Sequence, residues 1–123
     1  MKYSNVVVAG GGVLGSQIAF QAAYCGFNVT IWLRSEGSIG RTQPKIDHLK
    51  QTYIEAIEKM AEDKNAWCAG LADEDTFDKE ECLKKVENAY ANLKLELDMA
   101  KAVADADLVI CLLYTSDAAD DLI

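Results

Sequence analysis

The sequence predicts an α/β fold in which helices cover a parallel sheet. Segments with strand-like and helix-like apolar spacing alternate along the chain, and a glycine-rich turn separates the first two of them. A second strand-like segment follows within roughly 30 residues, which is the length of a β-α-β unit. The 123 residues, half of them hydrophobic, are enough for one modest domain with one core.

The first strand is predicted at the β-branched run Val6-Val7-Val8, which leads into Gly10-x-Gly12-x-x-Gly15. Gly10 allows a tight turn, Gly12 lets a diphosphate approach the main chain, and Gly15 lets the next helix pack closely. Free N–H groups and the positive helix end then face the anion. The residues predicted to bind a dinucleotide here are Gly10, Gly11, Gly12, Val13, Leu14 and Gly15. The alternative is a glycine turn with a purely structural role.

The first helix is predicted from Leu14 to Ala23, where apolar residues recur at helical spacing. Gly26 is placed to end it in the left-handed conformation. A second strand, Asn28–Leu33, follows directly. This β-α-β unit predicts a doubly wound sheet of the Rossmann type.

A polar loop that carries two glycines is predicted at residues 34–41. Thr42 then offers a helix cap, with Pro44 in the first turn. Apolar residues recur every three or four positions to near Asp63, which predicts a helix of about five turns. Residues 65–74 show no clear period and are predicted to be a connector.

A second long helix follows, for which Asp75 or Thr76 is the predicted cap. Its apolar residues share one face, and the charged residues between them form its solvated side; the apolar residues are Leu83, Val86, Ala89 and Tyr90. This helical pair between the second and third strands either fills space or reaches over a substrate, and the sequence favours neither interpretation.

The alternating segment Leu93–Leu97 predicts the third strand. Asp98 caps a short helix, Met99–Ala104, and the fourth strand begins at Asp107–Ile110. The apolar run in this last strand predicts burial on both faces.

Composition narrows the classes of function. The net charge of −8 argues against a general nucleic-acid surface, and no apolar run is long enough to cross a bilayer. The first strand begins so early that no signal peptide is expected before it. The four cysteines lack the spacing of a metal site and indicate incidental thiols in a reducing cytoplasm; they are Cys25, Cys68, Cys82 and Cys111. His48, the single histidine, is expected on a helix surface.

Two segments resemble the 3-hydroxyacyl-CoA dehydrogenase family: Val6–Ala19, and Ala102–Ile110 at the approach to the fourth strand. The long helical pair resembles the family in layout. The resemblance covers residues 1–110 and implies a partial NAD(P)-binding domain of an oxidoreductase. Such an enzyme moves hydride between the nicotinamide and the 3-hydroxy or 3-keto group of an acyl-CoA substrate.

The resemblance also implies what is missing. The family's catalytic histidine, its acidic partner, its serine and its asparagine lie beyond the fourth strand, so no catalytic residue is assigned in this chain. The sheet is expected to be incomplete, with an open edge that favours aggregation, and the 123 residues to be inactive alone. The parent is expected to be a homodimer through a helical C-terminal domain. Arg41, Lys45 and Lys50 are candidates for the CoA phosphates, unless they are simply solvated.

One departure from the family concerns the coenzyme. NAD-preferring members place an acid at the end of the second strand, where it accepts the ribose hydroxyls. Here Leu33 stands in that place, followed by Arg34 and Ser35, which suit a 2′-phosphate. The cofactor is therefore NAD or NADP, with Arg34 either binding the phosphate or stacking on the adenine.

Residues 111–123 do not resemble the family. The segment from Cys111 to Asp120 resembles the translation of a transposon-end adapter used in sequencing libraries, which implies a non-native read-through tail. Its first residues can still extend the fourth strand. Two other functions stay open: a reductase of another β-hydroxyacid or ketoacid, and a non-catalytic nucleotide-binding module.

Overall fold

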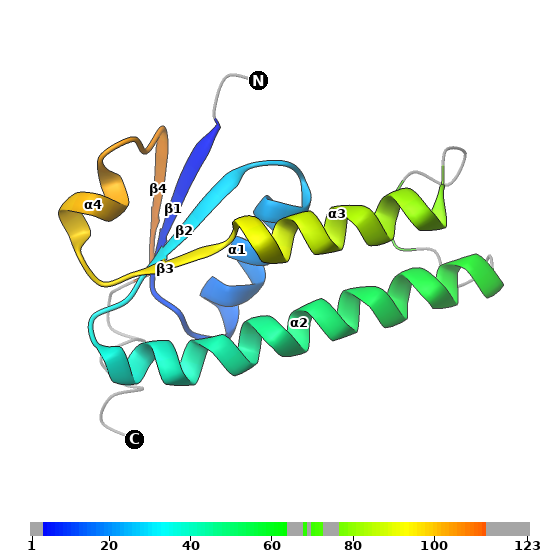
Figure 1. Ribbon diagram of the computed structural model, residues 1–123, viewed down its shortest axis with the longest axis horizontal. Coiled ribbons are helices and arrows are strands. Elements are labelled where there is room, and N and C mark those ends of the chain that lie inside the picture. The colour runs from blue at the N-terminus through cyan, green and yellow to red at the C-terminus, as the bar shows by residue number, and fades with distance from the viewer. Residues whose placement is uncertain (1–3, 64–67, 69, 73–76, 113–123) are drawn as a thin grey trace.

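A four-stranded parallel sheet forms the centre of the computed structural model, which describes residues 4–63, 68, 70–72 and 77–112 (Figure 1). The strand order is β3-β2-β1-β4, which confirms the predicted doubly wound sheet. All three strand pairs are parallel. The strands are β1 (Asn5–Ala9), β2 (Asn28–Trp32), β3 (Lys94–Glu96) and β4 (Leu108–Cys111).

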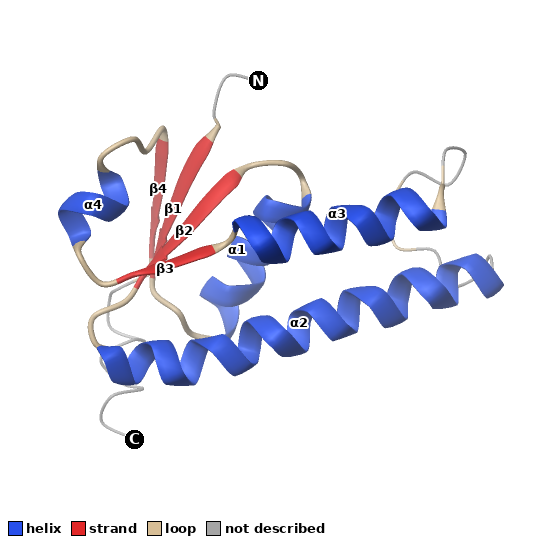
Figure 2. Ribbon diagram, viewed as in Figure 1, coloured by secondary structure: helices blue, strands red, loops and turns tan. Residues whose placement is uncertain are grey.

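The helices lie on both sides of this sheet. They are α1 (Val13–Tyr24), α2 (Glu36–Glu62), α3 (Lys79–Asn92) and α4 (Met99–Val103). Figure 2 shows α1, α2 and α3 on one side of the strands and the short α4 on the other. This is the arrangement that right-handed crossovers produce when the strand order reverses between β3 and β4. None of the helices in the described part of the chain is both long and apolar enough to cross a membrane.

The core lies between the sheet and the three-helix side. Val8 of β1 and Ile31 of β2 are paired in register, and both are fully buried. Phe20 of α1, Ile57 of α2 and Val86 of α3 are also fully buried in the same cluster. The long helical pair therefore shares the core of the sheet, and the predicted apolar face of α3 is confirmed.

The start of α2 differs from the prediction. The helix begins at Glu36, so most of the predicted loop at 34–41 is helical, and Thr42 is not its cap. Ser35 is the cap, with its Oγ accepting a hydrogen bond from Ser38 N at 3.3 Å. Pro44 lies inside the helix rather than in its first turn. Burial of Thr42 and partial burial of Ile39 outweigh the low helix propensity of the glycines.

The cap of α3 is Asp78, whose Oδ1 accepts hydrogen bonds from Glu80 N and Glu81 N. The predicted caps, Asp75 and Thr76, lie outside the described residues. Two other predicted caps are confirmed. Gly26 has a φ of 104°, in the left-handed region, and Asp98 caps α4.

The predicted burial of β4 on both faces is wrong. Leu108 is 44% exposed and Val109 is 46% exposed. Within the part of the chain that the structure describes, β4 pairs only with β1 and forms an edge of the sheet. The strand continues to Cys111, which is paired with Ala9. Residues 113–123, most of the predicted tail, lie outside the described residues.

Candidate functional site

The turn between β1 and α1 starts with an unusual backbone conformation. Gly10 has a φ of 128°, which residues with a side chain rarely adopt, and its N–H donates to the Trp32 carbonyl at 3.1 Å. The chain therefore leaves the sheet sharply and enters α1 above the carboxyl ends of β1 and β2. This confirms the tight turn predicted at the first glycine. In open α/β sheets, ligands bind beside this edge.

Gly15 brings the helix against the turn. A Cβ atom at this position would collide with the carbonyl oxygen of Gly10, which is a backbone atom and cannot swing away. Only a residue without a side chain allows this approach. The predicted close packing of the helix is therefore present.

Gly12 faces open space. It is the N-cap of α1. Within the described part of the chain, no side chain caps the helix there, and a Cβ atom on Gly12 would meet nothing within 4 Å. The first N–H groups of a helix have no acceptor within the helix, and the helix dipole makes this end positive. The start of α1 is thus an open cradle of backbone donors, which fits a diphosphate. The next two side chains, Val13 and Leu14, are 64% and 58% exposed beside it.

Two further residues contact this turn, and the sequence predicts neither contact. Ser16 Oγ and Thr42 Oγ1 each donate to the carbonyl oxygen of Gly11 at 3.2 Å, and both side chains are buried. A Cβ on Gly11 would collide with the side chains of Leu33 and Thr42. Thr42 is 31 residues from Gly11 in the sequence, so spacing alone carries no signal of this contact. The start of α2 therefore packs directly against the glycine turn.

The three residues predicted to lie beside the ribose, which are Leu33, Arg34 and Ser35, differ in their exposure to solvent. Leu33 is 3% exposed and lies under the turn, with its N–H donating to the Glu96 carbonyl. Arg34 and Ser35 are exposed at the end of β2. Leu33 thus contributes to the core, and the polar groups offered at this edge come from the two residues after it.

The three basic residues of α2 that are candidates for the CoA phosphates do not share one face. Arg41 and Lys45 are one turn apart, and Arg41 Nη2 donates to Ser38 Oγ at 3.0 Å. Lys45 borders a shallow apolar groove of about 280 Å³ between α2 and the first turns of α1, beside the glycine turn. Lys50 turns towards α3, where its Nζ lies 3.3 Å from Glu87 and 4.5 Å from the centre of the Tyr90 ring.

The shifted pKa values belong to residues away from the glycine turn, on the helices and just before β4. A hydrogen bond from Tyr90, followed by one from Gln43, lowers the pKa of Asp47 on α2. Burial raises the pKa of Tyr53 to about 12, and its hydroxyl donates to Gln21 Oε1 on α1. His48 is exposed on α2, as predicted.

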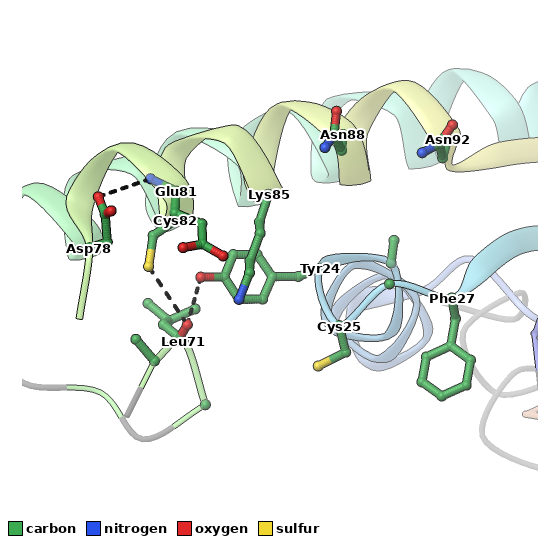
Figure 3. Close-up of a pocket in the computed structure, with 14 residues that line it drawn as sticks. Tyr24, Cys25, Phe27, Leu71, Asp78, Glu81, Cys82, Lys85, Asn88 and Asn92 are labelled. Carbon is green, nitrogen blue, oxygen red and sulfur yellow. Dashed lines mark hydrogen bonds between the residues drawn. The ribbon is translucent and has the colours of Figure 1, made fainter. Parts of the chain in front are cut away.

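A larger hollow of about 690 Å³ lies at the other end of α1 (Figure 3). There the Tyr24 hydroxyl donates to the Leu71 carbonyl at 2.6 Å, and Cys82 of α3 lies against the same oxygen. The 12 residues of α1 separate this hollow from Gly12 by about 18 Å. Its polar lining comes mainly from exposed side chains of α3. It therefore lies too far from the glycine turn to belong to the same site.

Comparison with protein families gives a match over residues 5–114 to a family model described as "3-hydroxyacyl-CoA dehydrogenase, NAD binding domain". No curated protein matches the chain in sequence.

Among solved structures, a diketoreductase that acts on dicarbonyl compounds is 31% identical with a TM-score of 0.68, and the match covers 99% of this chain and 36% of that one. FadB2 of M. tuberculosis is 20% identical with a TM-score of 0.60, over 97% of this chain and 34% of that one. The 3-hydroxybutyryl-CoA dehydrogenase of Escherichia coli is 20% identical with a TM-score of 0.58, over 99% and 21%. The chain therefore spans about a third or less of the length of these proteins.

Proposed function

The chain belongs to the 3-hydroxyacyl-CoA dehydrogenase family, and from this premise we propose that the start of α1 holds the pyrophosphate of a nicotinamide dinucleotide. The observation that carries the proposal is the open start of α1. Among the described residues, no side chain caps the helix there and nothing lies within 4 Å of a Cβ placed on Gly12, so the first backbone N–H groups stay accessible to an anion. The proposed contacts are the predicted ones: Gly10, Gly11, Gly12, Val13, Leu14 and Gly15. When bound, this coenzyme supplies or accepts the hydride of the reaction.

We propose that NADP is favoured over NAD. Leu33 occupies the place of the family's acid and is buried, so it offers the ribose no acceptor. Arg34 and Ser35 are exposed at the same edge, where a guanidinium and a hydroxyl suit a 2′-phosphate. The competing view is that NAD binds here with Arg34 stacked on the adenine.

Titration of the chain with NADH and NADPH tests this preference. We expect NADPH to bind more tightly, and Arg34→Ala to weaken NADPH binding about tenfold, because a charge-assisted contact contributes about 1.5–3 kcal/mol. NADH affinity should stay the same. Lys84→Ala removes one positive charge from the exposed surface of α3 and serves as the matched control. An Arg34→Ala chain with an unaltered preference would remove Arg34 from the argument.

For the whole protein we propose hydride transfer between NAD(P) and the 3-hydroxy or 3-keto group of an acyl-CoA. Arg41 and Lys45 lie one turn apart on α2 and are the candidates for the CoA phosphates, and Lys45 borders the apolar groove. Lys50 would have to leave Glu87 to take part. Cytoplasmic location and assembly as a homodimer are part of the same proposal.

A second candidate function is reduction of a dicarbonyl compound or ketoacid without CoA. It is favoured by the likeness to the diketoreductase, which alone among the three neighbours named above exceeds 30% identity. Steady-state kinetics of the whole protein with acetoacetyl-CoA and with a free diketo ester distinguish the two. If the substrate is an acyl-CoA, reversing the charges of Arg41 and Lys45 should raise its KM, whereas an unchanged KM favours the free dicarbonyl.

A further inference from the structure

The carbonyl oxygen of Gly11 lies between two buried hydroxyl groups. Ser16 Oγ from α1 and Thr42 Oγ1 from α2 each lie 3.2 Å from it, and the two side chains are 1% and 2% exposed. Both distances exceed the usual O–H···O separation of about 2.7 Å, so each bond contributes modestly and the carbonyl is held by the pair. These hydroxyls come from two different helices.

The direction of this carbonyl fixes the direction of the next amide. A trans peptide group is planar, so its C=O and N–H point in opposite directions, and no peptide bond in the described residues is cis. The hydroxyls hold the Gly11 carbonyl towards the interior. The Gly12 N–H therefore points away from these two hydroxyls. Gly12 itself lies where an added Cβ atom would meet nothing within 4 Å among the described residues.

The glycine turn also cannot move closer to the core. A Cβ on Gly11 would collide with Leu33 Cδ2 and Thr42 Oγ1, so the peptide already lies in contact with the end of β2 and with α2. The position of the proposed anion site is therefore fixed by residues that pack beneath the turn and do not face the anion.

We propose that Thr42 is a positioning residue for dinucleotide binding, acting together with Ser16. Its hydroxyl holds the Gly11 carbonyl, and through the shared peptide plane it directs the Gly12 N–H at the pyrophosphate. The inference rests on the proposed function. Because Thr42 belongs to α2, the same hydrogen bond links the position of the helical pair to the coenzyme seat.

The test measures NADH and NADPH affinity and melting temperature on the 123-residue chain and its variants. Thr42→Val keeps the shape of the side chain but removes the donor, so we expect about fivefold weaker binding of both coenzymes. Thr42→Ser keeps the hydroxyl and should restore the affinity to within about twofold of the starting chain. Ser16→Ala removes the other donor and should weaken binding like Thr42→Val.

The outcomes separate this proposal from the one on which it rests. If the unchanged chain binds neither coenzyme, the proposed function fails and the positioning role fails with it. If the unchanged chain binds and Thr42→Val binds equally well, the positioning role alone is overturned. Equal losses in Thr42→Ser and Thr42→Val would also overturn it, since packing would then be the cause. Should Thr42→Val not fold, an unchanged affinity in Ser16→Ala overturns the positioning role instead.

Discussion

Three glycines of the β1–α1 turn exclude a side chain for three different reasons. Gly10 has a positive φ, Gly15 leaves no room against the Gly10 carbonyl, and Gly11 is enclosed by Leu33 and Thr42. Gly12 differs from all of them because the space beside it is open. Substitutions at these positions should therefore separate folding from binding.

Gly15→Ala should destabilise the fold by about 1–3 kcal/mol, because the new Cβ overlaps a backbone oxygen that cannot move alone. Gly40→Ala is the matched control. Gly40 is an exposed residue inside α2, and a Cβ added there would meet nothing within 4 Å among the described residues. Alanine should therefore stabilise the fold by about 0.5–1 kcal/mol. Urea unfolding measures both changes. Equal effects at the two sites would contradict the packing described for Gly15.

At the residue scale, the sequence predicts contacts within a short motif but not contacts made by residues far away in the chain. The roles of Gly10 and Gly15 follow from the spacing of a strand, a turn and a helix, because all three are adjacent in the chain. The hydroxyl of Thr42 joins the turn only through the packing of α2. The sequence predicts a cap at this threonine, since capping is the local role of such a residue near a helix start.

At the scale of elements, the helical pair is joined by polar contacts as well as by the core. The Tyr90 hydroxyl of α3 donates to Asp47 Oδ1 of α2 at 2.6 Å, and Lys50 lies over the Tyr90 ring. The sequence predicts both helices and the apolar face of α3. It places the start of α2 at residue 42 because glycines usually interrupt helices, whereas burial of Ile39 and Thr42 extends this one.

Tyr90→Phe should destabilise the protein at pH 7 and lose that effect in acid. The hydrogen bond from Tyr90 lowers the pKa of Asp47 in the folded state, so its contribution is present above the unfolded pKa of about 4. The contribution is lost as the pH falls through the lower folded value. The urea midpoints of the two proteins should therefore differ most at pH 7, and the difference should shrink at pH 3.

The control for this change is Tyr53→Phe. Tyr53 donates to the neutral amide of Gln21, so its removal should cost stability equally at both pH values. If the difference in urea midpoint caused by Tyr90→Phe stays constant down to pH 3, the hydrogen bond to Asp47 is not its cause.

At the scale of the whole molecule, the two edges of the sheet are protected unequally. The edge strand β3 carries Lys94 and Glu96, whereas β4 presents the exposed apolar residues Leu108 and Val109. Charged side chains discourage pairing between sheet edges, and apolar ones permit it. The sequence predicts the open edge. It wrongly predicts that both faces of β4 are buried, because an apolar run does not show which elements are present to cover it.

Val109→Lys should reduce self-association of the chain, since a lysine at the β4 edge must be desolvated before another strand can pair there. Light scattering over a concentration series measures this. Ala91→Lys adds the same charge to the exposed surface of α3 and controls for net charge. If both variants reduce association equally, the edge is not the cause.

The most direct test of the whole account is the dinucleotide affinity of a Gly12→Val chain, with Thr52→Val on the exposed side of α2 as the control. A side chain at Gly12 has room in the fold but occupies the space in front of the free amides. We expect a melting temperature close to that of the unchanged chain and a loss of NADH and NADPH binding of at least about tenfold. Full retention of coenzyme affinity in this variant would contradict the assignment of the α1 start as the pyrophosphate seat.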